Sequence, residues 1–210
     1  MDDIEKLFRS RKTILEMFRD RGYRYKPELW IERKDDFKKL FYSKNIDFVA
    51  ETAEGVPVFV KWILYIKIKP NLVKETIDEI RTHNFAQETT AEGVKSFVPH
   101  KIILVSKAKS NTNITKIFKE KEFRGTELFW LNSIVFNLTK HMFVPKHELM
   151  SEEEVKQLMA ELYISNKYNL PVMLKSDPMT RYLNLNTGDV CKIVRYSPTS
   201  GQYFTYRVVK

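Results

Sequence analysis

The sequence is poor in cysteine, glycine and proline. Its single cysteine, Cys191, excludes an internal disulfide and a zinc site built on cysteines, and it is typical of a reducing compartment. Because Cys191 lies in the apolar run Val-Cys-Lys-Ile-Val, we expect a small core residue there rather than a nucleophile. Six glycines and eight prolines exclude a collagen-like or low-complexity chain.

The sequence also lacks a signal peptide and a membrane span. Residues 1–12 are charged throughout, whereas a signal peptide needs an apolar stretch near its start. The longest apolar stretch, Trp62 to Ile66, is far shorter than the roughly 20 residues that a membrane helix requires. We therefore expect a soluble intracellular protein that is not secreted and has no membrane partner.

The composition indicates a globular, basic protein. Of the 210 residues, 43% are hydrophobic and 30% are charged, and this length allows one large domain or two small ones. Lys and Arg total 36 against 27 Asp and Glu, and the net charge of +9 indicates a polyanionic partner. Residues 1–140 hold 27 basic and 20 acidic side chains, a net of +7, and residues 141–210 hold 9 and 7, a net of +2.

One loop in the more basic part mixes cations with small polar side chains. It begins with Lys107 and Lys109 and continues with Ser110, Asn111 and Thr112. Ammonium, hydroxyl and amide groups of this kind can contact phosphates. A solvated loop beside a lysine-rich helix face explains the same residues, and the sequence leaves both interpretations open.

Turn residues and apolar spacing predict the elements of residues 1–140. The expected helices are 2–22 with its stop at Gly22, one from Pro27 through Leu40, 71–82 capped by Asn71, 113–123, and a helical turn at 127–131. The expected strands lie within 56–68, at 101–106 and at 133–138. This alternation predicts an α/β domain with a partly parallel sheet that ends near Lys140.

Residues 141–210 predict a small α+β domain. Ser151 and Glu154 form a capping box, so a helix should start there and reach about Tyr163. Asp177-Pro178 should start a short helix that stops at Asn184. Strands at 190–196 and 203–209, joined by a turn at Ser200-Gly201, should form a hairpin.

No pattern of catalytic or cofactor-binding residues occurs. Glycine-rich phosphate loops and nucleophile elbows are absent, and the segment Val58 to Lys69 has no carboxylate to hold the cations of a metal nuclease. His141 and His147 could bind a metal, but a hydrogen bond to backbone or a carboxylate is the more common use of such histidines. The aromatic strand 203–207 could stack on bases, although packing or a protein interface is preferred. We expect no enzyme activity, cofactor or metal.

Four ordered blocks of residues 141–209 resemble one family. They are HMFVPKHELMSEEE at 141–154, LPVMLKSDPMTRYLNL at 170–185, GDVCKIVR at 188–195 and SPTSGQYFTYRVV at 197–209. The helix with Arg-Lys-Thr-Ile-Leu-Glu-Met that leads into Asp-Arg-Gly-Tyr at 20–23 matches as well. Together they resemble the fifth subunit of eukaryotic-type DNA-dependent RNA polymerases, which is common to polymerases I, II and III and has an archaeal counterpart. Residues 40–130 resemble the family only in their order of elements.

The resemblance implies a non-catalytic polymerase subunit. Residues 1–140 would form a jaw-like α/β domain near downstream duplex DNA, with the loop from Lys107 at the place of the family's Thr-Pro-Ser-Ala loop. Residues 141–210 would form an assembly domain that docks on the largest subunit, with neighbouring small subunits as further partners. The residues expected at this partner interface are His141, Val144, Pro145, His147, Asp177, Pro178, Arg181, Tyr182, Gly188, Arg195, Gly201, Tyr203, Tyr206 and Arg207.

The divergent, lysine-rich middle suggests a copy that belongs to a large cytoplasmic DNA virus. The expected location is the nucleus for a cellular protein, and the host cytoplasm and virion for a viral one. Two other functions fit parts of the sequence: a free-standing basic DNA-binding protein and a metal nuclease. The segment without carboxylates argues against the nuclease.

Overall fold

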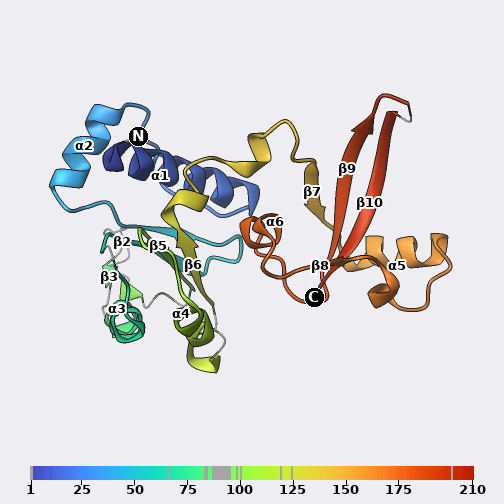
Figure 1. The fold of residues 1–210 in the computed structure, drawn as a ribbon. Helices are drawn as coiled ribbons and strands as arrows, with labels where there is room; N and C mark the ends of the chain where they lie inside the picture. The colour runs from blue at the N-terminus through green and yellow to red at the C-terminus, as the bar shows by residue number, and fades with distance from the viewer. Residues whose placement is uncertain are drawn as a thin grey trace. The chain divides into compact units, whose positions relative to one another are not determined.

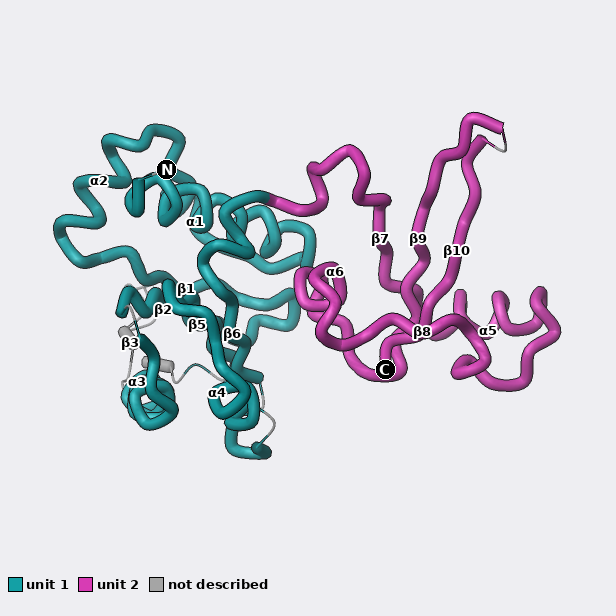
Figure 2. Tube along the Cα trace, in the orientation of Figure 1, with its two compact units in different colours: residues 1–136 teal, residues 137–210 magenta. Residues whose placement is uncertain are grey.

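Two compact units make up the chain, residues 1–136 and residues 137–210 (Figure 1, Figure 2). The structure is a computed structural model that describes residues 2–65, 67–82, 85–86, 96–97, 99, 101–118, 120–123, 125–199 and 201–210. Unit 1 is a mixed α/β unit, and unit 2 combines a sheet with short helices.

A four-stranded sheet forms the centre of unit 1. Its order is β1-β2-β5-β6, with β1 antiparallel to β2 and with β2, β5 and β6 parallel to one another, so the predicted partly parallel sheet is confirmed. The strands are β1 (Phe48–Glu51), β2 (Pro57–Ile63), β5 (Lys101–Ser106) and β6 (Thr126–Trp130). A separate two-residue pair joins β3 (Phe85–Ala86) to β4 (Ser96–Phe97).

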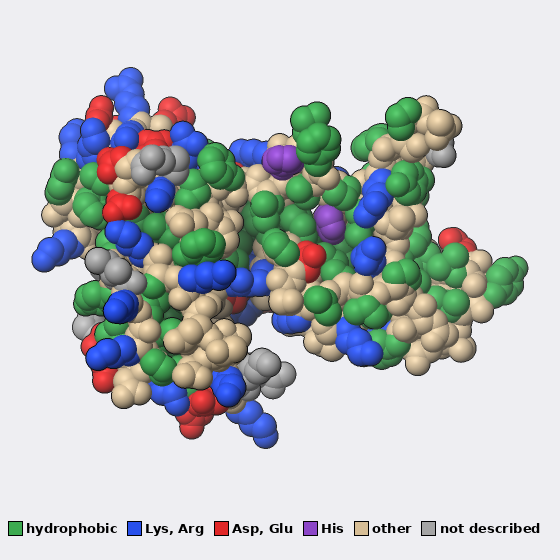
Figure 3. Space-filling view, in the orientation of Figure 1, with side chains coloured by type: hydrophobic (Ala, Val, Ile, Leu, Met, Phe, Trp, Pro, Cys, Tyr) green, Lys and Arg blue, Asp and Glu red, His purple; other side chains and the backbone are tan. Residues whose placement is uncertain are grey.

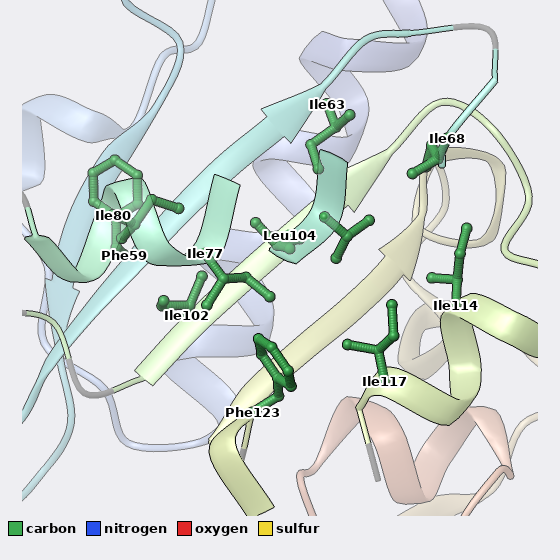
Figure 4. Packing of buried hydrophobic residues seen from close by; sticks show 11 residues of the cluster. Phe59, Ile63, Ile68, Ile77, Ile80, Ile102, Leu104, Ile114, Ile117 and Phe123 are labelled. Carbon is green, nitrogen blue, oxygen red and sulfur yellow. The ribbon is translucent and has the colours of Figure 1, made fainter. Parts of the chain in front are cut away.

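Helices cover both faces of this sheet. On one face, α3 (Pro70–Thr82) and α4 (Thr112–Ile117) bury isoleucines against β2 and β5, as Figure 4 shows for Ile77 and Ile117. On the other face lies α1 (Asp3–Asp20), where Trp62 Nε1 donates to Ser10 Oγ at 3.4 Å. Alternate residues of β2 therefore serve two cores, which explains why this strand is apolar on both sides.

The predicted helices of unit 1 are partly right. The first matches α1, and Gly22 ends it at φ +73° while the Tyr23 N–H donates to the Phe18 carbonyl at 2.8 Å. The helix expected from Pro27 is wrong as one piece, because the 3-10 helix η1 (Pro27–Leu29) ends at an extended residue and α2 (Lys34–Tyr42) starts anew. Likewise, the helix expected over 113–123 divides into α4 and the 3-10 helix η2 (Lys121–Phe123).

Two further predictions for this unit are wrong. Residues 127–131, expected as a helical turn, form most of β6, because their backbone pairs in parallel with β5. Residues 133–138, expected as a strand, form none: Ser133 ends the 3-10 helix η3 (Leu131–Ser133), and Leu138 begins the 3-10 helix η4 (Leu138–Lys140) of unit 2. The four-residue strand β1 was not predicted, and α3 starts at Pro70 rather than after Asn71. Proline suits a first helical position because its missing N–H has no partner to lose there.

Unit 2 contains a four-stranded sheet of order β7-β9-β10-β8. The predicted hairpin is confirmed as β9 and β10, paired from Gly201 with Ser197 to Val208 with Val190. Unit 2 consists of η4, β7 (Lys146–Leu149), α5 (Glu152–Glu161), the 3-10 helix η5 (Lys167–Asn169), β8 (Val172–Met173), α6 (Pro178–Tyr182), β9 (Val190–Ser197) and β10 (Gly201–Val209). Ser200, part of the predicted turn, lies outside the described residues.

Local signals in unit 2 act as the sequence predicts. Both hydrogen bonds of the Ser151 and Glu154 capping box are present at the start of α5. Asp177 caps α6 by accepting from the Met179 N–H at 2.8 Å, and Asn184 adopts the left-handed conformation at φ +54°. Cys191 is fully buried, as expected, and burial raises the pKa of its thiol to about 11.

Candidate binding surfaces

The loop after β5 lies at the carboxyl ends of the three parallel strands of unit 1. The Lys107 N–H donates to the Ile63 carbonyl at 3.0 Å, and Trp130 Nε1 donates to the Lys107 carbonyl at 3.2 Å. The ends of β2, β5 and β6 thus hold the first residue of this loop in place. In parallel α/β sheets, ligands commonly bind at this edge.

The two lysines of the loop have different contacts. Lys107 Nζ lies 2.6 Å from Asp3 Oδ2, and this hydrogen bond holds the pKa of the Asp3 carboxyl below its usual value. Lys109 Nζ lies 5.7 Å from the centre of the Trp130 ring, which is a cation–π distance. Both contacts are at the surface, so a phosphate could compete for either cation.

The polar residues that follow mainly begin α4. The Asn111 side chain accepts from the Ile114 N–H at 3.0 Å, so its oxygen serves as the helix cap. Thr112 is the first helical residue, and Ser110 and Thr112 are exposed. The sequence missed Leu64 and Tyr65, which are exposed and come directly after β2 at the same edge. The parallel-sheet rule is the signal that could have found them.

Unit 2 has a hollow of about 570 Å³ beside its hairpin. One wall is the segment 139–146, and the other is Val194, Arg195 and Tyr196 of β9 with Tyr203 of β10. Figure 3 shows unit 2 hollowed between the segment before β7 and the hairpin. The structure thus brings together five of the predicted interface residues: His141, Val144, Pro145, Arg195 and Tyr203.

The two histidines of unit 2 both take part in local hydrogen bonds. His147 Nδ1 lies 2.7 Å from the Pro145 carbonyl, to which it donates, and the Phe143 N–H donates to His141 Nδ1 at 3.3 Å. Burial lowers the pKa of His147, while the hydrogen bond to Pro145 opposes this shift. His147 thus makes a hydrogen bond to the backbone, which is the more common use of such a histidine.

Within the described ranges, no three His, Cys, Asp or Glu side chains gather into a group that could bind a metal ion. His83 and His100 lie outside the described residues.

The interface residues predicted on α6 lie elsewhere and support local structure. Asp177 caps the helix, Pro178 is its first residue and Arg181 lies in its last turn. Tyr182 is buried, and its hydroxyl accepts from Asn137 Nδ2 at 3.2 Å. Asp177, Pro178 and Tyr182 thus have structural roles, and the interface expected at α6 stays a prediction.

Four other predicted interface residues also have structural contacts or constraints. Gly188 has φ +93°, and a Cβ there would lie 3.3 Å from the Tyr168 hydroxyl. Gly201 has φ +65° where β10 begins. Tyr206 packs against the core of unit 2, and Arg207 Nη1 donates to the Val172 carbonyl at 3.0 Å. The contacts of Tyr206 and Arg207 favour packing over base stacking for the carboxy-terminal half of β10.

Among the described residues, no helix combines the length and the apolar character that crossing a bilayer requires.

Comparison with known proteins relates both ends of the chain to one family. Residues 1–55 match the family model described as RNA polymerase Rpb5, N-terminal domain, and residues 136–209 match the one described as RNA polymerase Rpb5, C-terminal domain.

Curated relatives match along almost the whole chain. "DNA-directed RNA polymerases I, II, and III subunit RPABC1" of Caenorhabditis briggsae is 28% identical, over 99% of this chain and 98% of the relative. The protein of the same title from Dictyostelium discoideum is 29% identical, over 99% of each chain. "DNA-directed RNA polymerase subunit 5-like protein 1" of Arabidopsis thaliana is 27% identical, over 98% of this chain and 96% of the relative.

Proposed function

Because the chain belongs to the Rpb5 family of RNA polymerase subunits, we propose that it is a non-catalytic structural subunit of a multisubunit DNA-dependent RNA polymerase. The observation that carries this proposal is the match along both units, to relatives titled as subunits shared by polymerases I, II and III. DNA-directed RNA polymerase activity would belong to the assembly, and this chain would contribute structure to it.

We assign assembly to unit 2. Its hollow and hairpin expose apolar side chains, and a permanent protein interface would cover them. The proposed partners are the largest subunit and its neighbouring small subunits. The residues of α6 would act indirectly, by fixing the fold on which this surface depends.

We assign contact with downstream duplex DNA to unit 1. Residues 1–136 hold 26 basic and 20 acidic side chains, a net of +6 out of the chain's +9, and Lys107 and Lys109 follow β5 at the carboxyl ends of the parallel strands. Attraction to phosphates needs no reading of base sequence, which suits a jaw that DNA passes.

A native pull-down tests this function. The tagged full-length chain, expressed in its own host, should co-purify with the two large polymerase subunits at near-equal stoichiometry. The purified chain alone, with magnesium, should neither extend RNA nor cleave DNA. Recovery of the chain as a monomer in a native lysate would overturn the proposal.

The net charge of +9 supports one alternative, a free-standing DNA-binding protein. The isolated chain would then retain duplex DNA at physiological salt, and its affinity would fall steeply as salt rises. The proposed location depends on whether the protein is cellular or viral. A cellular subunit would act in the nucleus, and a viral copy in the host cytoplasm and the virion.

A further inference from the structure

We propose that the hollow of unit 2 binds an extended, acidic segment of a partner polymerase subunit, one that also carries a large apolar side chain. This inference rests on the proposed function and names the chemistry of the partner at that surface.

The charges around the hollow favour an acidic occupant. Its lining includes Lys140, Lys146 and Arg195, and none of the lining residues is Asp or Glu. Lys146 Nζ already pairs with Glu148 at 2.7 Å. No carboxylate of the described residues pairs with the exposed Arg195, so a partner carboxylate could form a two-point contact with its guanidinium.

The exposed surface around the hollow is also strongly apolar. Met142, Phe143 and Tyr196 are 86%, 79% and 77% exposed, and all three line the hollow. Large aromatic and methionine side chains beside an arginine are the residue types enriched in the centres of protein interfaces. Phosphate contacts alone would not require them, so a polypeptide fits this surface better than a nucleic acid.

The sheet edge at the hollow favours an extended segment. The last pair between β7 and β9 joins Lys146 to Val194, and the chain before β7 then leaves the sheet in a turn closed by the Val144 N–H and the His141 carbonyl, 2.9 Å apart. The Val190 carbonyl accepts from the Met150 N–H, so the backbone groups of Val190 point toward β7. Every second residue of a strand turns its backbone groups to the same side, so those of Tyr196 also point to the β7 side of β9. Beyond β7, this edge can accept the backbone of another strand.

Charge reversal in the assembled enzyme tests the proposal. The full-length chain with Arg195→Glu is assembled with the other subunits of the polymerase, and its release from the tagged assembly is followed as salt rises. We expect an apparent affinity at least tenfold weaker than that of the wild type, while Arg195→Lys stays within about threefold. Lys210→Glu, at the opposite end of β10, makes the same charge change away from the hollow and should behave as the wild type.

Photo-crosslinking identifies the occupant directly. Tyr196 is replaced by benzoylphenylalanine in the assembled polymerase, and the crosslinked peptide is identified by mass spectrometry. We expect a peptide of another polymerase subunit with net negative charge and an aromatic or large aliphatic residue. The same substitution at Tyr168, outside the hollow, should not yield that peptide.

The outcomes separate this proposal from the proposed function. If the wild-type chain co-purifies with the large subunits but Arg195→Glu is released like the wild type, the acidic occupant is wrong and the subunit role stands. A crosslink to a basic peptide, to nucleic acid or to nothing would also overturn the proposal. If the wild-type chain itself does not assemble, the proposed function fails with it.

Discussion

The Arg21 guanidinium donates two hydrogen bonds to the Glu127 carboxylate, at 2.9 and 2.8 Å. These residues join the end of α1 to β6, and only 2% of the Arg21 side chain is exposed. Burial alone would lower the pKa of Arg21, but the charge and the hydrogen bonds of Glu127 raise it above its ordinary value. The pair therefore keeps a buried cation charged and ties the edge of the sheet to the amino-terminal helix.

Glu127→Gln should destabilise unit 1 because it leaves the buried guanidinium without its counter-charge. We expect a loss of about 2–4 kcal/mol in the free energy of unfolding, measured by urea denaturation at pH 7. Glu122→Gln makes the same change at an exposed position and should cost less than about 0.5 kcal/mol. Equal effects of the two substitutions would contradict a structural role for the pair.

This ion pair also explains why the sequence misplaced β6. Residues 127–131 satisfy a helical pattern locally, and nothing adjacent to them indicates that Arg21 and β5 will pair with them. Contacts this distant in sequence override local propensity. In contrast, α5, α6 and the hairpin depend on capping and turn residues within a few positions, and the sequence predicted all three.

The candidate surfaces, too, were predicted only in part from the sequence. Of the interface residues that the resemblance implied, His141, Val144, Pro145, Arg195 and Tyr203 line the hollow, whereas those of α6 do not. Met142, Phe143 and Tyr196 were missed because an apolar residue in a sequence is expected in the core. Only the folded chain shows these three to be exposed.

Removal of both loop lysines should weaken contact with DNA and leave assembly intact. Lys107→Ala with Lys109→Ala removes two cations from the carboxyl ends of the parallel strands. If both contact phosphates, the negative slope of log affinity for DNA against log salt should become shallower by about 1.8 in the assembled polymerase. Lys38→Ala with Lys39→Ala removes two cations from α2 and serves as the control. An unchanged slope in the loop variant would count against the assignment.

Asp3→Asn should have the opposite effect on DNA contact. Asp3 holds Lys107 at 2.6 Å, so the carboxylate competes with any phosphate for this ammonium group. Removal of the competing charge should strengthen DNA binding by the assembled polymerase about two- to threefold at low salt, and less at high salt. Asp2→Asn changes the same charge one residue away and is the matched control. Equal gains from both variants would indicate a general charge effect and not release of Lys107.

Tyr163→Gly should stabilise unit 2. Tyr163 has φ +53° and follows Leu162, the C-cap of α5; the Ile164 N–H donates to the Met159 carbonyl at 3.0 Å, and the Tyr163 side chain is 96% exposed. Glycine adopts this left-handed conformation without strain, so we expect a gain of about 0.5–1 kcal/mol in urea denaturation. Tyr163→Ala keeps a β-carbon and should give no such gain. A loss of stability in the glycine variant would show that the tyrosine ring packs favourably despite its exposure.

His147 should make unit 2 less stable in mild acid. Burial depresses the pKa of the folded-state imidazole below its unfolded value of about 6.5, so the unfolded chain binds a proton more readily. The stabilising contribution of neutral His147 is present above pH 6.5 and is lost as the pH falls below it. We expect the urea midpoint of unit 2 to fall between pH 7.5 and 5.5, and this fall to be smaller in His147→Gln. His141→Gln, at an exposed position, should keep the wild-type pH dependence. The role of His147 would be refuted if its substitution left the pH profile unchanged.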